Sequence, residues 1–185
     1  LVSGARHASV TFRVEGSQGA AALTGGDRLP GVVNRYVGDA RGWQAGIETF
    51  GRVVARQVRP GIDVVYYGNQ QQLEYDFVIA PGADVEAAAM VIDGADSLAI
   101  EAASGDLLVH VGDQVLRQRA PVAYQDIAGQ RVPVRSAFTL DVSAMRVGFI
   151  IGDYDRSRTL VIDPVLVYST WFGGNSEEAI LAMKV

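Results

Sequence analysis

Apolar and polar side chains alternate with a period of two along much of this chain, and this alternation constrains the fold more than any other feature. The pattern is clear over residues 10–14, 73–79, 136–140 and 147–151. Successive side chains of a β-strand point to opposite faces, so such a pattern predicts a strand with one buried face and one face in water. The chain is therefore expected to be built from strands.

Turn residues divide these alternating segments at short intervals. Residues 62–67 are apolar on both faces apart from Asp63, which predicts a central strand covered on both sides. Gly112-Asp113 and Ala128-Gly129 each lie between two strand-like segments and suit hairpin turns. About a dozen short, mainly antiparallel strands with little helix are expected. The predicted fold class is all-β, of the β-sandwich type.

Three segments fit the pattern less well. Residues 85–92 follow Asp84, a suitable N-cap, and contain strong helix formers, so helix and strand are both open there. Residues 16–31 are rich in Gly, Ala, Ser and Thr and predict a loop with at most one weak strand near 20–23. Residues 39–46, around Trp43, fit either one helical turn or a loop.

Composition excludes several classes of protein. With 49% hydrophobic residues and a mean hydropathy of +0.15, the chain has enough apolar surface to form a core. Its net charge is −5 and its 16 basic residues are scattered, so we expect no nucleic-acid partner. Cysteine is absent, which removes disulfides and thiolate metal sites. No apolar segment approaches the roughly 20 residues of a membrane span.

Several longer segments resemble one bacterial family. They are residues 29–43 (LPG, then NRY, then Trp43), 60–68 (PGIDVVYYG), 73–84 (LEYDFVIAPGAD), 117–125 (RQRAPVAYQ) and 154–170, which ends in LVIDPVLVYST. Together they are similar to the uncharacterised domain that precedes SBBP repeats, which are β-propeller-type repeats, in large exported bacterial proteins.

The resemblance implies an extracellular or bacterial cell-surface location. It implies a β-sandwich-like domain over residues 1–167, and relatives usually carry additional strands upstream of this domain. Over residues 168–185 it implies either the start of a propeller-type repeat or a linker. It also favours a strand over residues 88–92. It transfers no catalytic residue.

Three carboxylates are candidate metal ligands. Asp153 and Asp155 stand two residues apart in a predicted loop, and Asp163 follows on the next strand. Carboxylates in this arrangement can share a hard cation such as calcium, although the spacing is not that of an EF-hand loop. The alternative interpretation is a solvated turn in which Arg156 and Arg158 form local ion pairs. No other cofactor is expected.

Three further acids are candidate ligand-binding residues. Glu74 and Asp76 share one face of a predicted strand, where paired carboxylates could act on a glycoside, but a water-exposed strand face is the favoured interpretation. Asp63 is the lone charge of an apolar segment, and pairing with an arginine or capping of the preceding turn is favoured for it. The tyrosines that could stack on a sugar, or fill the core instead, are Tyr66, Tyr67, Tyr75 and Tyr124.

Three functions are therefore weighed. The first is a non-catalytic structural or assembly domain at the cell surface, which associates through strand edges with other copies of itself or with adjacent β-rich domains. The second is an extracellular polysaccharide-binding module, assisted by calcium or not. The third is a hydrolase that uses Glu74 with Asp76 or Asp63, and no enzymatic activity is the expectation we favour.

Overall fold

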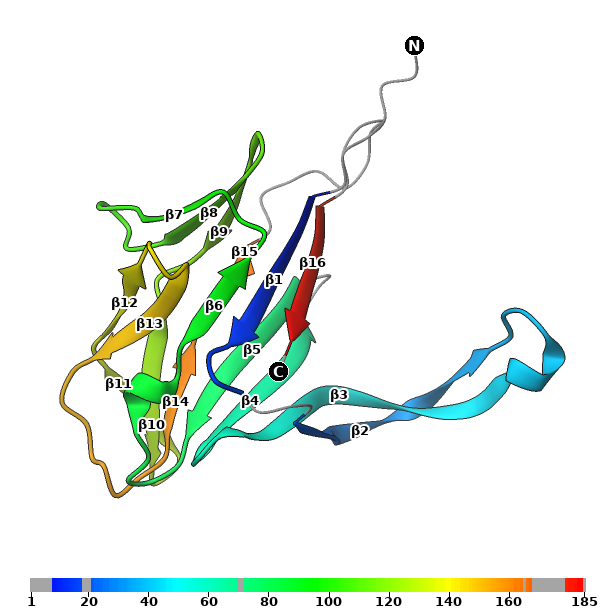
Figure 1. Cartoon of the computed structure of the whole chain (residues 1–185). Helices are drawn as coiled ribbons and strands as arrows, with labels where there is room; N and C mark the ends of the chain where they lie inside the picture. The colour runs from blue at the N-terminus through cyan, green and yellow to red at the C-terminus, as the bar shows by residue number, and fades with distance from the viewer. Residues whose placement is uncertain (1–7, 18–20, 70–71, 165, 168–178, 185) are drawn as a thin grey trace, which may run out of the picture.

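The computed structural model describes residues 8–17, 21–69, 72–164, 166–167 and 179–184, and it confirms the all-β fold class (Figure 1). The described strands form sheets of five, seven and four strands, ordered β12-β13-β6-β1-β16, β11-β10-β14-β5-β4-β3-β2 and β15-β9-β8-β7. Helix is limited, in the described residues, to two short 3-10 turns. Strand pairs are antiparallel except for β1 with β16.

The bounds of the elements follow the alternating segments closely. The described elements are β1 Ala8–Val14, β2 Ala22–Arg35, η1 Ala40–Gly42, β3 Gln44–Arg59, β4 Ile62–Asn69, β5 Gln72–Ile79, η2 Val85–Ala87, β6 Met90–Asp93, β7 Ser97–Ile100, β8 Leu107–Val111, β9 Gln114–Gln118, β10 Val122–Ile127, β11 Gln130–Val134, β12 Ser136–Asp141, β13 Arg146–Ile151, β14 Leu160–Asp163, β15 Leu166–Val167 and β16 Ala179–Lys184.

The five-stranded and seven-stranded sheets pack face to face and enclose one hydrophobic core (Figure 1). Phe12 of β1, Phe77 of β5 and Phe149 of β13 lie in it, and the last two rings are in edge contact at 5.6 Å. Leu107 and Val109 of the four-stranded sheet join the same core. Alternation places these side chains inside and their chain neighbours outside, as the sequence predicts.

The strands β4, β5, β14 and β10 lie side by side in the seven-stranded sheet and determine where its polar face lies. Ile62 and Val64 of β4 are fully buried, but Asp63 and Val65, which alternate with them and point to the other face, are only half-buried. The expectation that this strand is covered on both sides is therefore too strong. Its outward face belongs to an open sheet surface.

Local turn chemistry explains the connections. Gly112 has φ 56° between β8 and β9, and Ala128 and Gly129 have φ 54° and 79° between β10 and β11, so both predicted hairpins are formed. Asp84 caps a single 3-10 turn by accepting a hydrogen bond from the Glu86 N–H at 3.0 Å. Strand β6 begins only at Met90, so the segment 85–92 contains both a short turn and a strand.

The largest departure from the sequence prediction is a long hairpin formed by β2 and β3. Residues 16–31 were expected to be mostly loop, but β2 spans 14 residues and pairs with the 16-residue β3. Its outer part projects away from the body of the molecule (Figure 1). We call residues 22–53 the arm. Its side chains are exposed on both faces, so they show no clear alternation, which is why the prediction was wrong.

The C-terminal segment is described only in part. Residues 168–178, where the start of a propeller-type repeat was expected, lie outside the described residues. Beyond them β16 lies at the edge of the five-stranded sheet, parallel to β1, with Val10 opposite Leu181 (Figure 1). In the described part of the chain, no helix has the length and apolar character needed to cross a membrane.

Candidate functional site

The outward face of the seven-stranded sheet brings two of the predicted ligand-binding acids together with two tyrosines. Glu74 lies opposite Tyr67 across the β4–β5 pair, and Asp76 is the next outward residue of β5. Asp163 is the outward residue at the end of β14, and Tyr124 of β10 lies beside that strand. We call this surface the tyrosine–acid face. Its members are Tyr67, Glu74, Asp76, Tyr124, Arg131 and Asp163.

The centre of this face is a hydrogen bond between Tyr67 and Asp76. The phenol of Tyr67 donates to Oδ1 of Asp76 at 2.9 Å. The carboxyl of Asp76 is half-buried, and this burial raises its pKa to about 6. The hydrogen bond from Tyr67 lowers the pKa but has the smaller effect. Burial and the neighbouring carboxylate together raise the pKa of Tyr67 well above its ordinary value. A proton is therefore held on this pair more firmly than on free side chains.

Asp163 and Tyr124 extend the face towards β11. Burial, and then the charge of Glu74, raise the pKa of Asp163 above its ordinary value. Its Oδ1 is buried without a hydrogen-bond partner. The guanidinium of Arg131 lies over the Tyr124 ring, 4.4 Å from the ring centre, in a cation–π contact. The Tyr124 side chain stays partly exposed beside it.

The tyrosines of the sequence thus divide between the core and this face. Tyr75 is buried in the core and Tyr66 packs against it, whereas Tyr67 and Tyr124 point outward and are half-buried. Two rings and the carboxylates beside them are suited to stacking and hydrogen bonding of a polar ligand. Cavities are found elsewhere, one of about 520 Å³ beside Arg59 and one of about 360 Å³ beside Ile150.

The three candidate metal ligands do not form one cluster in the described residues. Asp155 accepts hydrogen bonds from the Ser157 hydroxyl at 2.6 Å and backbone N–H at 2.9 Å, and pairs with Arg158 at 3.1 Å. These donors lower its pKa. Asp163 belongs to the tyrosine–acid face, and Asp153 is exposed. Within the described residues, no group of three or more His, Asp or Glu side chains is arranged to hold a metal ion.

Asp63 has a structural environment. Its Oδ1 accepts a hydrogen bond from the backbone N–H of Gln57 at 2.7 Å, and its Oδ2 pairs with Arg56 at 3.4 Å. Gln57 has φ 50° at an irregular point of the β3–β4 pairing. The carboxylate therefore stabilises a bulge in β3, which agrees with the interpretation that it pairs with an arginine.

The arm is the second candidate site, and sequence analysis missed it. Ten of the sixteen exposed large apolar side chains in the described residues belong to it: Leu23, Leu29, Val32, Val33, Tyr36, Val37, Trp43, Ile47, Phe50 and Val53. A monomeric domain seldom gathers so many on one projection. The only available signal was the density of β-branched and aromatic residues over 32–54, which is typical of strands.

The arm is ordered by its own contacts. The Phe50 ring covers Gly25 so closely that a Cβ there would lie 2.5 Å from ring atoms. Such cover of a glycine by a cross-strand aromatic ring stabilises a ribbon. Ion pairs join Arg28 to Glu48 at 2.8 Å and Arg52 to Asp27 at 3.1 Å across the two strands. The arm is thus a defined surface on which a partner can bind.

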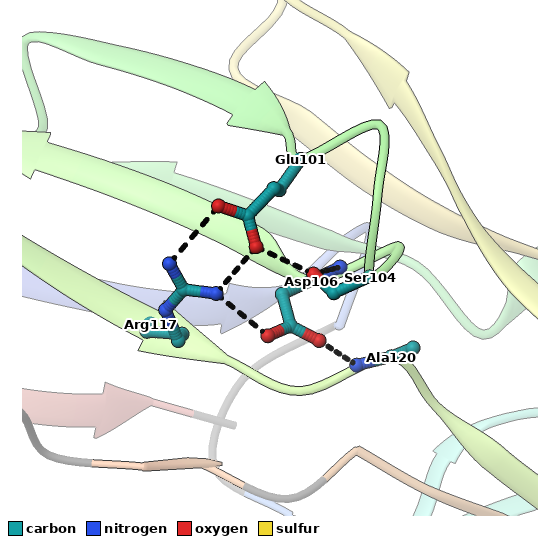
Figure 2. A network of polar contacts seen from close by, with 5 residues as sticks. All are labelled: Glu101, Ser104, Asp106, Arg117 and Ala120. Carbon is teal, nitrogen blue, oxygen red and sulfur yellow. Dashed lines mark hydrogen bonds and ion pairs between the residues drawn. The ribbon is translucent and has the colours of Figure 1, made fainter.

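A third polar cluster, also missed, lies on the four-stranded sheet (Figure 2). Arg117 of β9 contacts both oxygens of Glu101, at 2.6 and 3.2 Å, and Oδ2 of Asp106 at 2.9 Å. Asp106 also accepts from the Ala120 N–H at 2.9 Å, and Ser104 donates to Glu101 at 2.7 Å. Every member is satisfied within the cluster, so its role is to fasten the β7–β8 turn to the end of β9.

These surfaces belong to an all-β domain built of packed antiparallel sheets. By sequence, the chain belongs to the family described as domain of unknown function DUF7948, whose model matches residues 3–165. Searches of curated proteins and of solved structures find no significant match to the chain.

Proposed function

We propose that this chain is a non-catalytic structural or assembly domain that associates with further copies of itself through the arm. We also propose that it lies at the bacterial cell surface and precedes a propeller-type repeat region. The resemblance of residues 60–84 and 117–170 to domains of exported proteins supports the location. The arm supports the assembly role, and its ten exposed apolar side chains are the observation that carries the proposal.

An arm of this kind is costly to leave uncovered. An isolated two-stranded ribbon is marginally stable in water, because neither face is packed. Among the described strands, β2 also lies at the edge of the seven-stranded sheet, so no described strand pairs with its outer side. Pro30 lacks a backbone N–H and the pairing shifts between Arg28 and Val32, so the edge is usable only in two short stretches. The apolar faces therefore contribute more than the edge.

The dimensions and charge of the arm fit a second copy. Fourteen residues of β2 extend about 45 Å, so the two faces of a ribbon about 10 Å wide offer some 900 Å². A stable interface needs roughly 800 Å² per partner. The arm carries three acidic and four basic residues, and two ion pairs join its strands, so two copies can approach without strong repulsion.

The test removes the arm without disturbing the core. Residues 25–53 are replaced by Asn-Gly, so that Thr24 and Val54, which face each other, close a two-residue hairpin. The core residues Ala55 and Val58 are retained. Sedimentation velocity over a hundredfold range of concentration should show association of the whole chain and a monomer for the shortened one, with unchanged circular dichroism.

A point variant and a control sharpen the result. Val32→Lys places a charge on the arm at a side chain that is 56% exposed and should weaken association at least tenfold. Val142→Lys makes the same change at a 57% exposed side chain in the β12–β13 turn and should leave association unchanged. A whole chain that stays monomeric at the highest concentration, or a shortened chain that still associates, would contradict the assembly role.

A second candidate function is the binding of extracellular polysaccharide at the tyrosine–acid face. The observation that favours it is the outward placement of Tyr67 and Tyr124 beside half-buried carboxyls. Isothermal titration with neutral and acidic polysaccharides, with and without calcium, tests it. Tyr124→Ala should abolish binding, whereas Tyr36→Ala on the arm should not. Equal binding by both variants would exclude this face.

A further inference from the structure

We propose that the tip of the arm docks into a recess at the end of β13 in a second copy, so that the copies join head to tail. This inference rests on the proposed function, because it names the surface that receives the arm. The tip comprises residues 35–43. The recess is a cavity of about 360 Å³ lined by residues from η2, β13 and the loop after it.

The tip is a preformed apolar knob with one unpaired charge. Tyr36 and Trp43 meet edge to face with ring centres 5.3 Å apart, and the indole N–H donates to the Gly38 carbonyl at 3.3 Å. Tyr36, Val37 and Trp43 are 58%, 64% and 51% exposed. The side chain of Arg35, at the base of the tip, has no hydrogen-bond or ion-pair partner among the described residues. Rings held in this way can bind without losing much conformational freedom.

The recess has the complementary composition. Its apolar part is formed mainly by Ile150, which is 60% exposed, because the side chain of the neighbouring Phe149 points to the core on the other face of the sheet. Its rim carries the exposed carboxylates of Glu86 and Asp153, and neither has a partner among the described side chains. The remaining charge on the rim is Arg156, which lies 5.9 Å from the centre of the Tyr154 ring.

Chemistry and size therefore match. The exposed aromatic pair of the tip can contact the exposed Ile150 side chain, and the Arg35 guanidinium can pair with the carboxylates of Glu86 and Asp153 on the polar rim. Aromatic anchors in a pocket, with charged pairs at the rim, are the usual plan of a protein interface. A cavity of about 360 Å³ lies at the small end of the range of ligand pockets, which suits one or two side chains of the tip as an anchor, while the other exposed apolar side chains of the arm supply the rest of the interface.

The two surfaces lie on opposite sides of the molecule. The arm extends from one side of the body, whereas η2 and the end of β13 lie on the other (Figure 1). A contact between two different surfaces is heterologous, and it continues into an open chain unless the rotation closes a ring. The placement therefore favours a filament over a closed two-fold dimer.

Complementation between two defective variants tests the contact. The tip variant carries Arg35→Glu and Trp43→Ser, and the recess variant carries Asp153→Arg and Ile150→Ser. Each alone should be monomeric by sedimentation velocity, with circular dichroism like that of the unchanged chain, because all four side chains are exposed. An equimolar mixture should form a heterodimer that does not grow, since one intact tip meets one intact recess.

A charge exchange within one chain provides the second measurement. Arg35→Glu combined with Asp153→Arg should restore at least a tenfold tighter association than either single variant. Val142→Lys again serves as the control. A recess variant that assembles like the unchanged chain, or a mixture that stays monomeric, would overturn the docking site while leaving arm-mediated assembly intact. Loss of the arm without any effect on association would overturn both.

Discussion

The phenol of Tyr67 donates a hydrogen bond of 2.9 Å to the carboxyl of Asp76. Burial of this carboxyl raises the pKa of Asp76 to about 6. Two strands supply the pair, β4 and β5, and the register of the sheet brings them together. The desolvation of Asp76 has the larger effect on its pKa, and the donated hydrogen bond only moderates it. This balance determines how stability depends on pH.

Asp76 should make the protein more stable as pH falls from about 6 to about 4. In this window the folded carboxyl, with a pKa of about 6, binds a proton that the unfolded one releases. The free energy of unfolding therefore increases as pH falls, and the gain is absent above about pH 6. Asp76→Asn should remove most of this pH dependence. At pH 7 it also removes a half-buried charge, and because solvent screens this partly exposed group, we expect a stabilisation of only about 1 kcal/mol.

Urea unfolding at pH 7, 6, 5 and 4 measures this effect. Asp113→Asn, in the exposed turn between β8 and β9, is the control and should keep the pH dependence of the unchanged chain. Adding Asp163→Asn to Asp76→Asn should flatten the profile further, because burial also raises the pKa of Asp163. An Asp76→Asn profile parallel to that of the unchanged chain would refute the assignment.

Arg117 should contribute to stability through its cluster with Glu101 and Asp106. Arg117→Met leaves both carboxylates without their shared partner and should lower the midpoint of thermal unfolding by roughly 2–4 °C. Arg117→Lys keeps the charge but loses the two-pronged contact with Glu101, so it should restore only part of the loss.

The acid dependence of Arg117→Met provides an internal check. The Arg117 contacts lower the pKa of Glu101, and the Ala120 N–H and Arg117 lower that of Asp106 although its desolvation opposes them. Their contribution is present above the ordinary carboxyl pKa and is lost as pH falls through the lowered values. Scanning calorimetry should therefore find the difference between Arg117→Met and the unchanged chain shrinking below about pH 4. A constant difference would argue against an ionic cause.

Tyr75 should contribute a buried hydrogen bond to the core. The Gln118 side chain is fully buried and its Nε2 donates to the Tyr75 hydroxyl at 2.5 Å and to the Pro164 carbonyl at 3.1 Å. Tyr75→Phe removes one acceptor and should lower the free energy of unfolding by about 1–2 kcal/mol in urea titrations. Tyr66→Phe, on the neighbouring strand, is the control and should change it by less than about 0.5 kcal/mol. If Tyr75→Phe and Tyr66→Phe lowered the free energy of unfolding equally, the hydrogen bond from Gln118 would not contribute to stability.

The parts of the fold that could be predicted are those with one dry face. Phe12 lies between Thr11 and Arg13, and Phe77 follows Asp76, so the alternation of apolar and polar residues located β1 and β5. The large apolar residues Val147, Phe149 and Ile151 recur at every second position and located β13 in the same way. The arm has two wet faces, and Gly25 and Gly26 interrupt it, so neither periodicity nor propensity indicated β2. Its order depends on contacts across the hairpin, such as the Phe50 ring over Gly25, which a sequence does not display.

The sites show the same limit. Glu74 and Asp76 were predicted to share a face because strand geometry requires it. The contribution of Asp163 depends on β14 lying beside β5, which is a pairing between distant segments. Asp163 was grouped with Asp153 and Asp155 by sequence distance, but the sheet places it with Tyr67 and Asp76 instead.

The hairpin turn between β10 and β11 offers a stabilising change. Ala128 and Gly129 both have positive φ, 54° and 79°, which is the conformation of a type I′ turn. An alanine is strained in this region, whereas asparagine tolerates it, and Ala128 is exposed. Ala128→Asn creates the preferred Asn-Gly pair and should raise the free energy of unfolding by about 0.5–1 kcal/mol.

Gly129→Ala is the opposing variant for this turn. Nothing lies within 4 Å of the added Cβ, so the whole effect comes from the backbone at φ 79° and should be a loss of about 1 kcal/mol. In the unchanged chain Asp126 accepts the Gly129 N–H at 2.9 Å, and neither substitution removes this donor or acceptor, so the comparison reports backbone preference. Urea titration of the two variants should therefore bracket the unchanged chain, and a loss of stability in Ala128→Asn would show that the turn is not of this type.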